Sequence, residues 1–455
     1  MEQPRVLVGK TYFVKTFGCQ MNLHDSERVA GVLDSCGCIC VDDPDQADIV
    51  VFMTCCVREK ADQHLYGQAS AMVSAPTPPS GRRVVAIGGC IAQRDGEKIR
   101  EHVACADVVF GTSAIESLPA LLADAFSGDG SHAEVDTVEE GRSFSTDLPS
   151  HRAQRFHAWV PIMTGCDNFC TYCIVPYVRG REKSRTMESI VSEVEALVAE
   201  GVREVTLLGQ NVNSYGRNIY GEPRFAELLR RVGETGIERI RFTSSNPKDL
   251  DDEVIRAMAE VPAVMPHLHL AVQSGSSRVL KAMNRKYTRE EYLELVGRLR
   301  AAIPELALST DIIVGFPGET EEDFEETLSL VREANFSSAF TFIYSRRPGT
   351  PAAKMPDDTP REVIQERFDR LADLVAEQAH GANQADLGQL VSVLVEGASK
   401  RDANIMVGHS EKNRTVHFTV PEGRDPENLV GTICDVRVEE ARTWYLRGSI
   451  EGEPR

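Results

Sequence analysis

Residues 165–173 read Gly165-Cys166-Asp167-Asn168-Phe169-Cys170-Thr171-Tyr172-Cys173. The C-x3-C-x2-C spacing places three thiols within one short segment. Three thiolates on a cubane iron–sulfur cluster leave one iron without a protein ligand, and an open metal position is where a small molecule can bind. The alternative is a zinc knuckle, but zinc prefers four ligands, and the nearest candidate for a fourth is His157. The segment therefore predicts a catalytic iron–sulfur cluster.

The region around this segment, residues 152–382, alternates short apolar runs with helical stretches such as Met187–Glu200 and Glu321–Glu333. The predicted strands are Ala158–Met163, Glu204–Leu208, Arg239–Phe242, His267–Val272, Leu308–Val314 and Ala339–Ile343. Six βα units are fewer than the eight that close a full barrel. The pattern thus predicts an α/β domain built as a partial (β/α)6 barrel.

The preceding region, residues 10–127, also alternates short apolar runs with helical stretches, over a shorter length. Its predicted strands are Tyr12–Val14, Ile49–Met53, Val84–Ile87 and Val108–Phe110, with helices that start near Asp25, Glu59, Gln93 and Ala114. Alternation of this kind predicts an α/β domain with a parallel sheet covered by helices. Residues 128–151 are polar and acidic, which predicts a linker between the two domains.

The last region, residues 384–451, changes to an alternation of period two in the runs Leu390–Val395, Thr415–Val420 and Ile433–Val438. This alternation predicts a small antiparallel β-barrel. The region resembles the TRAM domain, an RNA-binding module. It carries eight Lys and Arg against eleven Asp and Glu, so we expect it to orient RNA rather than attract it.

Three further cysteines, Cys19, Cys55 and Cys90, each follow a predicted strand of the first domain. The carboxyl ends of parallel strands meet at one edge of a sheet, where α/β proteins bind ligands. Small residues beside these cysteines would let the backbone approach a bulky inorganic group. The three thiols are candidates for a second cluster, and buried core thiols are the alternative. Neighbouring residues diverge at a strand end, so only one of Cys55 and the adjacent Cys56 should reach such a cluster.

Other cysteines are predicted to be structural. Cys36, Cys38 and Cys40 alternate along the chain, which predicts three small core residues on one face of a strand.

Four strings resemble motifs of the radical S-adenosylmethionine (SAM) methylthiotransferase family. The first is Thr16-Phe17-Gly18-Cys19-Gln20-Met21-Asn22, followed by Asp25-Ser26-Glu27. The second and third are Thr54-Cys55-Cys56-Val57-Arg58-Glu59-Lys60-Ala61 and Gly89-Cys90-Ile91-Ala92-Gln93. The fourth is Cys166–Cys173, continued by Ile174-Val175-Pro176-Tyr177 and Arg179-Gly180. The resemblance covers nearly the whole chain and implies two 4Fe–4S clusters. One, on Cys166, Cys170 and Cys173, would bind and cleave SAM, and the other, on Cys19, Cys55 and Cys90, would deliver sulfur.

The resemblance also implies a substrate and partners. Gln20-Met21-Asn22 favours the members that add a methylthio group to C2 of N6-isopentenyladenosine beside the tRNA anticodon. The alternatives are members that act on threonylcarbamoyladenosine or on a ribosomal protein, and a non-catalytic RNA-binding protein that uses its cysteines for zinc. The implied partners are the tRNA anticodon stem-loop and proteins that donate electrons and sulfur, whose identity the sequence does not give. No catalytic residues beyond the cluster ligands are expected.

Polar residues follow several predicted barrel strands, at the ends where barrel enzymes place their functional groups. The candidates for SAM contacts are Gln210, Asn211, Ser244, Gln273, Ser274 and Asp311. Each could instead be a strand-end cap.

The formal net charge of −19 argues against non-specific affinity for nucleic acid over the whole surface. Two local basic stretches remain candidates for tRNA phosphates, with Arg179 in the first and Lys281 and Arg285 in the second; both could also be solvated faces. No run is apolar enough to span a bilayer, and the start lacks the pattern of a signal peptide. We therefore expect a cytoplasmic protein with no membrane partner, whose twelve cysteines are thiols or metal ligands.

Overall fold

The computed structural model of the chain describes residues 4–56, 59–128, 132–134, 148–420, 423 and 425–455. Contacts divide the chain into two compact units. Unit 1 comprises Met1–Ala153, Met163–Phe169 and Cys173–Lys183, and unit 2 comprises Gln154–Ile162, Cys170–Tyr172 and Ser184–Arg455. Most of the predicted linker 128–151 lies outside the described residues. Among the helices that are described, none has the length and apolarity needed to cross a membrane.

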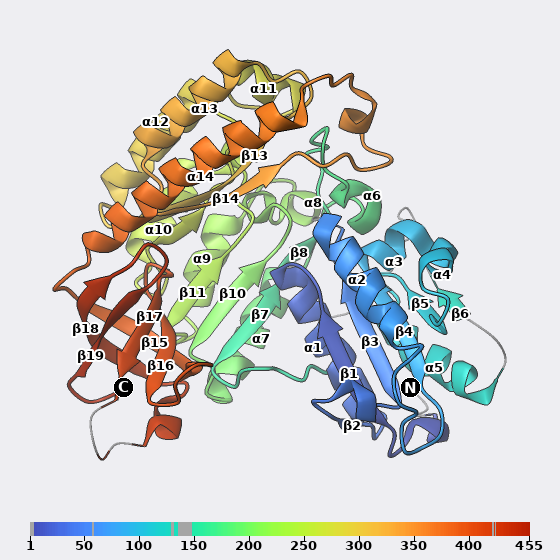
Figure 1. The fold of residues 1–455 in the computed structure, drawn as a ribbon. Helices are drawn as coiled ribbons and strands as arrows, with labels where there is room; N and C mark the ends of the chain where they lie inside the picture. The colour runs from blue at the N-terminus through green and yellow to red at the C-terminus, as the bar shows by residue number, and fades with distance from the viewer. Residues whose placement is uncertain (1–3, 57–58, 129–131, 135–147, 421–422, 424) are drawn as a thin grey trace. The chain divides into compact units, whose positions relative to one another are not determined.

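Unit 1 is built on a parallel sheet with the strand order β2-β1-β3-β4-β5-β6 (Figure 1). Its strands are β1 (Thr11–Thr16), β2 (Ile39–Cys40), β3 (Ile49–Thr54), β4 (Val84–Gly89), β5 (Val108–Phe110) and β6 (His132–Glu134). Every residue of β3 and β4 is buried, as expected where helices cover both faces of a parallel sheet. The predicted α/β class of this part of the chain is confirmed.

The helices of unit 1 are α1 (Gln20–Ser35), α2 (Glu59–Ala71), α3 (Cys90–Asp95), α4 (Ile99–His102), α5 (Leu118–Ser127) and α6 (Val175–Arg179). Alternate residues of β3 belong to different hydrophobic clusters, because successive side chains of a strand point to opposite faces. One cluster packs α1 and α5 against the sheet. The other packs α3 and also α6, which contributes Ile174 at its N-cap and Val178.

Two helices of unit 1 begin earlier than predicted. Helix α1 begins at Gln20 rather than near Asp25, and α3 begins at Cys90 rather than near Gln93. The apolar pattern marks only where a helix packs, whereas the first turn follows directly from the strand-end turn. As a result Cys19 is the N-cap of α1 and Cys90 is the first residue of α3.

Cys36 and Cys38 are buried core residues as predicted, but the prediction that Cys36, Cys38 and Cys40 share one face of a strand is wrong. Cys36 is the C-cap of α1, and only Cys40 lies in a strand, the short edge strand β2, where it is exposed. Helix α1 extends to Ser35 and is capped by Cys36, so the alternation begins at the end of a helix rather than in a strand.

Unit 2 contains the predicted partial barrel. Its described parallel strands are β7 (His157–Pro161), β10 (Glu204–Leu208), β11 (Arg239–Phe242), β12 (His267–His269), β13 (Ala307–Val314) and β14 (Ser338–Ile343). Parallel bridges Ile240↔Val264 and Ser245↔Leu270 connect the β7-β10-β11 half to the β12-β13-β14 half. Regular pairing in β12 ends at His269 rather than at the predicted Val272, because the chain turns into a loop there.

Helices between these strands pack outside them. They are α7 (Met187–Ala199), α8 (Arg217–Tyr220), α9 (Phe225–Gly233), α10 (Asp252–Glu260), α11 (Ser277–Ala282), α12 (Arg289–Ala302) and α13 (Glu321–Ala334). The long α14 (Arg361–Gln384) follows β14 and packs against it. Two short strands, β8 (Met163–Thr164) and β9 (Lys183–Ser184), flank the three-cysteine segment and α6 in the sequence.

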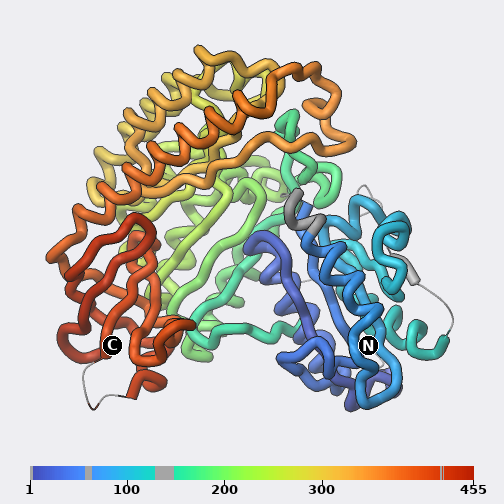
Figure 2. Tube along the Cα trace, in the orientation of Figure 1, coloured from blue at the N-terminus to red at the C-terminus, as the bar shows by residue number. Residues whose placement is uncertain are grey.

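The C-terminal part of unit 2 is a closed β-barrel with the order β15-β16-β17-β19-β18, visible as the red trace in Figure 2. Its strands are β15 (Leu390–Ala398), β16 (Ile405–Ser410), β17 (Thr415–Thr419), β18 (Ile433–Ala441) and β19 (Leu446–Glu451). The pairs are antiparallel except for β17 with β19, which is parallel. Arg239 and Arg241 of β11 donate to carbonyl groups of β15 and β16, Arg239 to Ser392 at 3.0 Å and Arg241 to Ser410 at 2.7 Å.

Candidate active site

Cys19, Cys55 and Cys90 follow three strands that are neighbours in the sheet of unit 1. They come after β1, β3 and β4 in turn, and β3 pairs with both of the others. All three strands are parallel, so the cysteines lie at one edge of the sheet, where a sheet of this kind binds ligands. Cys55 and Cys90 are buried and Cys19 is partly exposed.

Two glycines bring the backbone close to these cysteines. Gly18 has φ +126°, and a Cβ atom there would lie 2.1 Å from the Cβ of Cys55. Gly89 has φ +93°, and a Cβ atom there would lie 2.7 Å from the carbonyl oxygen of Thr54. Only glycine tolerates both the left-handed backbone and the close approach. The cysteine-bearing turns are therefore built tightly enough for their thiols to converge.

The cysteines of this edge interact in pairs. A hydrogen bond from Cys55 lowers the pKa of the Cys19 thiol to about 6, assisted by the charge of Arg179 and opposed by burial. A hydrogen bond from Cys56 lowers the pKa of Cys90 to about 7, again with help from Arg179 and against burial. Because Cys56 is the donor, its own pKa is raised well above the usual value. Cys19 and Cys90 are thus prepared to be thiolates, the form that binds metal.

Asn22 is a site residue that the sequence reasoning did not identify as such. Its side chain is fully buried, and its amide donates to the carbonyl oxygens of Phe17 at 3.1 Å and Thr54 at 2.5 Å. Its oxygen lies 3.7 Å from the Cys19 sulfur and accepts a hydrogen bond from Arg179 at 3.3 Å. Asn22 therefore fixes the cysteine-bearing turns after β1 and β3. The signal in the sequence was its place in the string Gln20-Met21-Asn22.

Arg179 lies inside unit 1 rather than on a solvated face. Its Nε donates to the Cys90 sulfur at 3.4 Å, and its Nη2 donates to Asp25 at 2.8 Å. Only 7% of the side chain is exposed. This placement differs from the expectation that Arg179 meets tRNA phosphates, because its donors are directed to partners within unit 1.

The cysteines of the C-x3-C-x2-C segment occupy the loop between β8 and α6. Within unit 1, the backbone N–H of Cys166 donates to Gly180 at 3.1 Å, and its sulfur accepts from the Asn168 side chain at 3.3 Å. Phe169 has φ +46°, a left-handed conformation that is unusual for an aromatic residue. Cys166 is buried and Cys173 is partly exposed. The loop is thus held in a defined, locally strained shape.

Cys170 belongs to unit 2, where an arginine lies beside it. Arg285 donates to the Cys170 sulfur at 3.5 Å, to the hydroxyl of Tyr287 at 2.7 Å and to the carbonyl of Ala271 at 2.7 Å. Arg285 was expected to bind tRNA, but its guanidinium is directed to the cysteine. Lys281, the other candidate in this stretch, is exposed.

The donor sets of both segments fit iron–sulfur clusters. Each presents three cysteines, and in each an arginine donates to one sulfur, as is common for anionic clusters, whose sulfurs accept hydrogen bonds. Over the described residues, no three His, Cys, Asp or Glu side chains are grouped as ligands of a single metal ion. His157, the candidate fourth zinc ligand, is hydrogen-bonded to Thr206 of β10 at 3.0 Å, and burial lowers its pKa.

Five of the six SAM candidates follow barrel strands, as predicted, and Asp311 lies within β13. Ser244 and Gln273 adopt left-handed backbone conformations, with φ +63° and +73°. Such conformations cost about 1–3 kcal/mol outside glycine and cluster at ligand sites. Asp311 of β13 accepts from His269 at 3.3 Å and is only partly buried. These three residues are the strongest of the six as ligand contacts.

The other candidates have partners in the protein. Asn211 is buried and donates to Asp249 at 2.8 Å, and the fully buried Ser274 accepts from the backbone of Ser276 at 3.2 Å. Gln210 lies beside Asn211, partly exposed and with a partner of its own.

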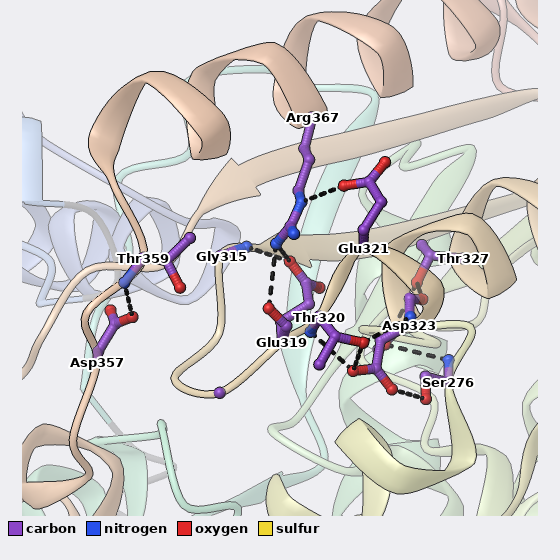
Figure 3. A network of polar contacts seen from close by, with 12 residues as sticks. Ser276, Gly315, Glu319, Thr320, Glu321, Asp323, Thr327, Asp357, Thr359 and Arg367 are labelled. Carbon is purple, nitrogen blue, oxygen red and sulfur yellow. Dashed lines mark hydrogen bonds and ion pairs between the residues drawn. The ribbon is translucent and has the colours of Figure 1, made fainter.

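Helix α13 holds the loop that carries Gln273 and Ser274, and Figure 3 shows its Asp323 in contact with Ser276. Asp323 accepts from Ser276 at 2.6 Å, and Thr327 accepts from the backbone of Gly275 at 2.9 Å. A Cβ atom on Gly275 would lie 2.4 Å from the Cα of Thr327, so the close approach requires glycine. The strand-end loop is therefore fixed by its contact with α13.

The segment Gly315–Glu319, which follows β13, is a structural turn (Figure 3). The carboxylate of Glu319 accepts from the backbone of Gly315 at 2.8 Å, and Arg367 donates to the carbonyl of Glu319 at 3.1 Å. Burial raises the pKa of Glu319 to about 7. Its acidic side chain closes the turn from inside.

Three protein-family models together match most of the chain. Residues 160–331 match the radical SAM superfamily, residues 11–111 match uncharacterized protein family UPF0004, and residues 384–450 match the TRAM domain. A protein of Acidothermus cellulolyticus named tRNA-2-methylthio-N(6)-dimethylallyladenosine synthase is 50% identical over 436 residues, 95% of this chain and 86% of the relative. A protein of the same name from Nocardioides sp. is 51% identical over 443 residues, 96% of this chain and 88% of the relative. The chain belongs to this synthase family.

The synthase family uses SAM and two 4Fe–4S clusters. A more distant synthase from Acetivibrio thermocellus is still 46% identical over 444 residues, 97% of this chain and 91% of the relative. The resemblance read from the four cysteine-bearing strings is thereby confirmed.

Solved structures confirm the fold at lower identity. The radical SAM methyltransferase TsrM from Kitasatospora setae aligns with a TM-score of 0.55 and 16% identity over 76% of this chain and 77% of its own. The cobalamin-dependent radical SAM enzyme OxsB aligns with a TM-score of 0.50 and 13% identity over 82% of this chain and 56% of its own.

Proposed function

We propose that this chain is a radical SAM methylthiotransferase that adds a methylthio group to C2 of N6-isopentenyladenosine (dimethylallyladenosine) in tRNA. The observation that carries the proposal is the identity of about half of all residues with synthases of that name over nearly the whole chain. The cysteines, the barrel and the C-terminal β-barrel required for this reaction are all present in the chain.

In this proposal Cys166, Cys170 and Cys173 hold the cluster that binds SAM, and Cys19, Cys55 and Cys90 hold the auxiliary cluster. When bound, the two clusters supply the electron that cleaves SAM to a hydrogen-abstracting radical and the sulfur that is transferred. The chain itself lowers the pKa of the Cys19 and Cys90 thiols and directs one arginine to a sulfur of each set.

The barrel residues would orient SAM. We assign direct contacts to Ser244, Gln273 and Asp311, with Gln210, Asn211 and Ser274 shaping the loops behind them. Two observations support the assignment: the left-handed backbone at two of the strand ends, and the hydroxyl of Ser245, which is buried without a hydrogen-bond partner among the described residues. A buried polar atom without a partner is costly, and a bound ligand would satisfy it.

The site of action on RNA is proposed to be the anticodon stem-loop, whose unstacked bases can enter a pocket. Because its proposed substrate is tRNA, we infer that the enzyme acts in the cytoplasm, where mature tRNA is found. An electron donor and a sulfur donor are required as further partners.

The function is tested by mass spectrometry of tRNA nucleosides. Bacteria that lack their own methylthio synthase should accumulate N6-isopentenyladenosine, and expression of this chain should convert it to the 2-methylthio form. Threonylcarbamoyladenosine should stay unmodified in the same samples. Methylthiolation of that nucleoside or of a ribosomal protein, with isopentenyladenosine unchanged, would contradict the proposal.

A contact between Lys281 and tRNA phosphate can be tested separately. Lys281 is exposed, whereas the neighbouring Arg285 is directed to Cys170. Lys281→Ala should reduce the slope of log affinity against log salt concentration by about one unit, because one phosphate contact is lost. Arg231→Ala, which removes a half-exposed charge from α9, is the control. An unchanged slope for Lys281→Ala would mean that the lysine lies on a solvated face.

A further inference from the structure

The auxiliary site contains a buried ion pair between Arg179 and Asp25. Arg179 of α6 contacts the sulfur of Cys90 through Nε and reaches Asp25 and Asn22 through Nη2. The side chains of Arg179 and Asp25 are 7% and 10% exposed. A guanidinium in this position places its charge beside the sulfur with little screening by water.

A second set of contacts holds Asp25 in place. Arg28 donates through Nε to Nε2 of His24 at 3.1 Å, so the proton of the His24 ring is on Nδ1. That nitrogen lies 3.4 Å from Oδ1 of Asp25, whereas Arg179 donates to Oδ2. Asp25 is thereby fixed between His24 and Arg179, and the guanidinium cannot turn away from Cys90 without losing its ion pair.

Helix α6 presents Arg179 rigidly. Ile174, at its N-cap, and Val178 pack into the hydrophobic cluster that also includes Cys90 and Ile91. The helix follows Cys173 directly in the sequence. The segment after the SAM cysteines is therefore part of the packed wall of the auxiliary site.

We propose that Arg179 is a positioning residue that raises the reduction potential of the auxiliary cluster, and that Asp25 sets the size of this effect. The inference rests on the proposed assignment of Cys90 as a ligand. Reduction adds negative charge to a cluster, so a nearby cation and a hydrogen bond to a ligand sulfur favour the reduced form. Asp25 partly cancels the positive charge while it fixes the guanidinium in place.

The proposal predicts shifts of opposite sign for the two partners. Arg179→Gln removes the cation and should lower the midpoint potential, whereas Asp25→Asn leaves the cation uncompensated and should raise it. Arg179→Lys keeps the charge but not the planar fork of donors, so its potential should lie between those of Arg179→Gln and the parent. A merely structural role would move both variants in the same direction or neither.

The experiment uses the full chain with Cys166, Cys170 and Cys173 replaced by Ala, so that only the auxiliary cluster is present. The midpoint potential is measured by a redox titration followed by electron paramagnetic resonance, and iron per chain is determined for every variant. Arg83→Gln is the matched control. Arg83 directly precedes β4, whereas Cys90 follows the end of that strand, and the Arg83 guanidinium donates to the carbonyls of Ala47 and Asp45.

The outcomes distinguish a failure of the proposed role of Arg179 from a failure of the ligand assignment on which it rests. A parent without iron would overturn the assignment of Cys19, Cys55 and Cys90. Iron retained with an unshifted potential in Arg179→Gln, or shifts of the same sign in Arg179→Gln and Asp25→Asn, would overturn the role of Arg179. If Arg179→Gln cannot hold the cluster, the midpoint potentials of Arg179→Lys and Asp25→Asn test the proposal instead. Potentials equal to that of the parent in both variants would overturn the role of Arg179.

Discussion

Replacement of Cys166, Cys170 and Cys173 by Ala is expected to abolish SAM cleavage and the methylthio product, and to remove about half of the iron, because one of two four-iron clusters is lost. In the proposed assignment the three thiolates are the protein ligands of this cluster and leave one iron open for SAM. Anaerobic iron analysis and detection of 5′-deoxyadenosine measure the two effects.

The control for this prediction is Cys40→Ala, which removes an exposed thiol from an edge strand of unit 1. It should keep both the iron and the cleavage activity. A triple variant with the full iron content would show that the C-x3-C-x2-C segment holds no cluster.

Cys55→Ala is expected to lose the auxiliary cluster and all methylthiolation while keeping SAM cleavage. Cys55 donates to Cys19, and its Cβ is the atom that a side chain on Gly18 would strike. The adjacent Cys56→Ala should keep both clusters. Cys56 is buried and serves as a hydrogen-bond donor to Cys90, so its loss should lower stability by about 1 kcal/mol.

Cys55 and Cys56 have the same chemistry and nearly the same burial, so neither property shows which of them is the ligand. Iron per chain and the tRNA product distinguish the two variants. Cys56→Ala without iron in the auxiliary site, together with an intact Cys55→Ala protein, would mean that the ligand is the second cysteine of the pair.

Much of the fold could be predicted from the sequence. Glu204–Leu208 and Arg239–Phe242 were predicted with the bounds that the structure has. Residues 205–208 are a run of apolar and β-branched residues, as expected of a buried parallel strand, whereas Arg239–Phe242 alternates arginine with apolar residues. The starts of α1 and α3 were predicted too late, since a cysteine at a helix N-terminus carries no capping signature. The alternation of Cys36, Cys38 and Cys40 suggested a strand where a helix ends.

The sequence by itself determined which cysteines are candidate ligands, because ligand spacing and the order of strand-end turns are properties of the chain. Only the tertiary structure decided what surrounds them. Arg179 reaches a cysteine 89 residues earlier, and Arg285 one that lies 115 residues earlier. In sequence both belong to basic stretches that suggest phosphate binding. A guanidinium at the end of a long side chain takes the partner that folding brings within reach, and no local spacing records which partner that is.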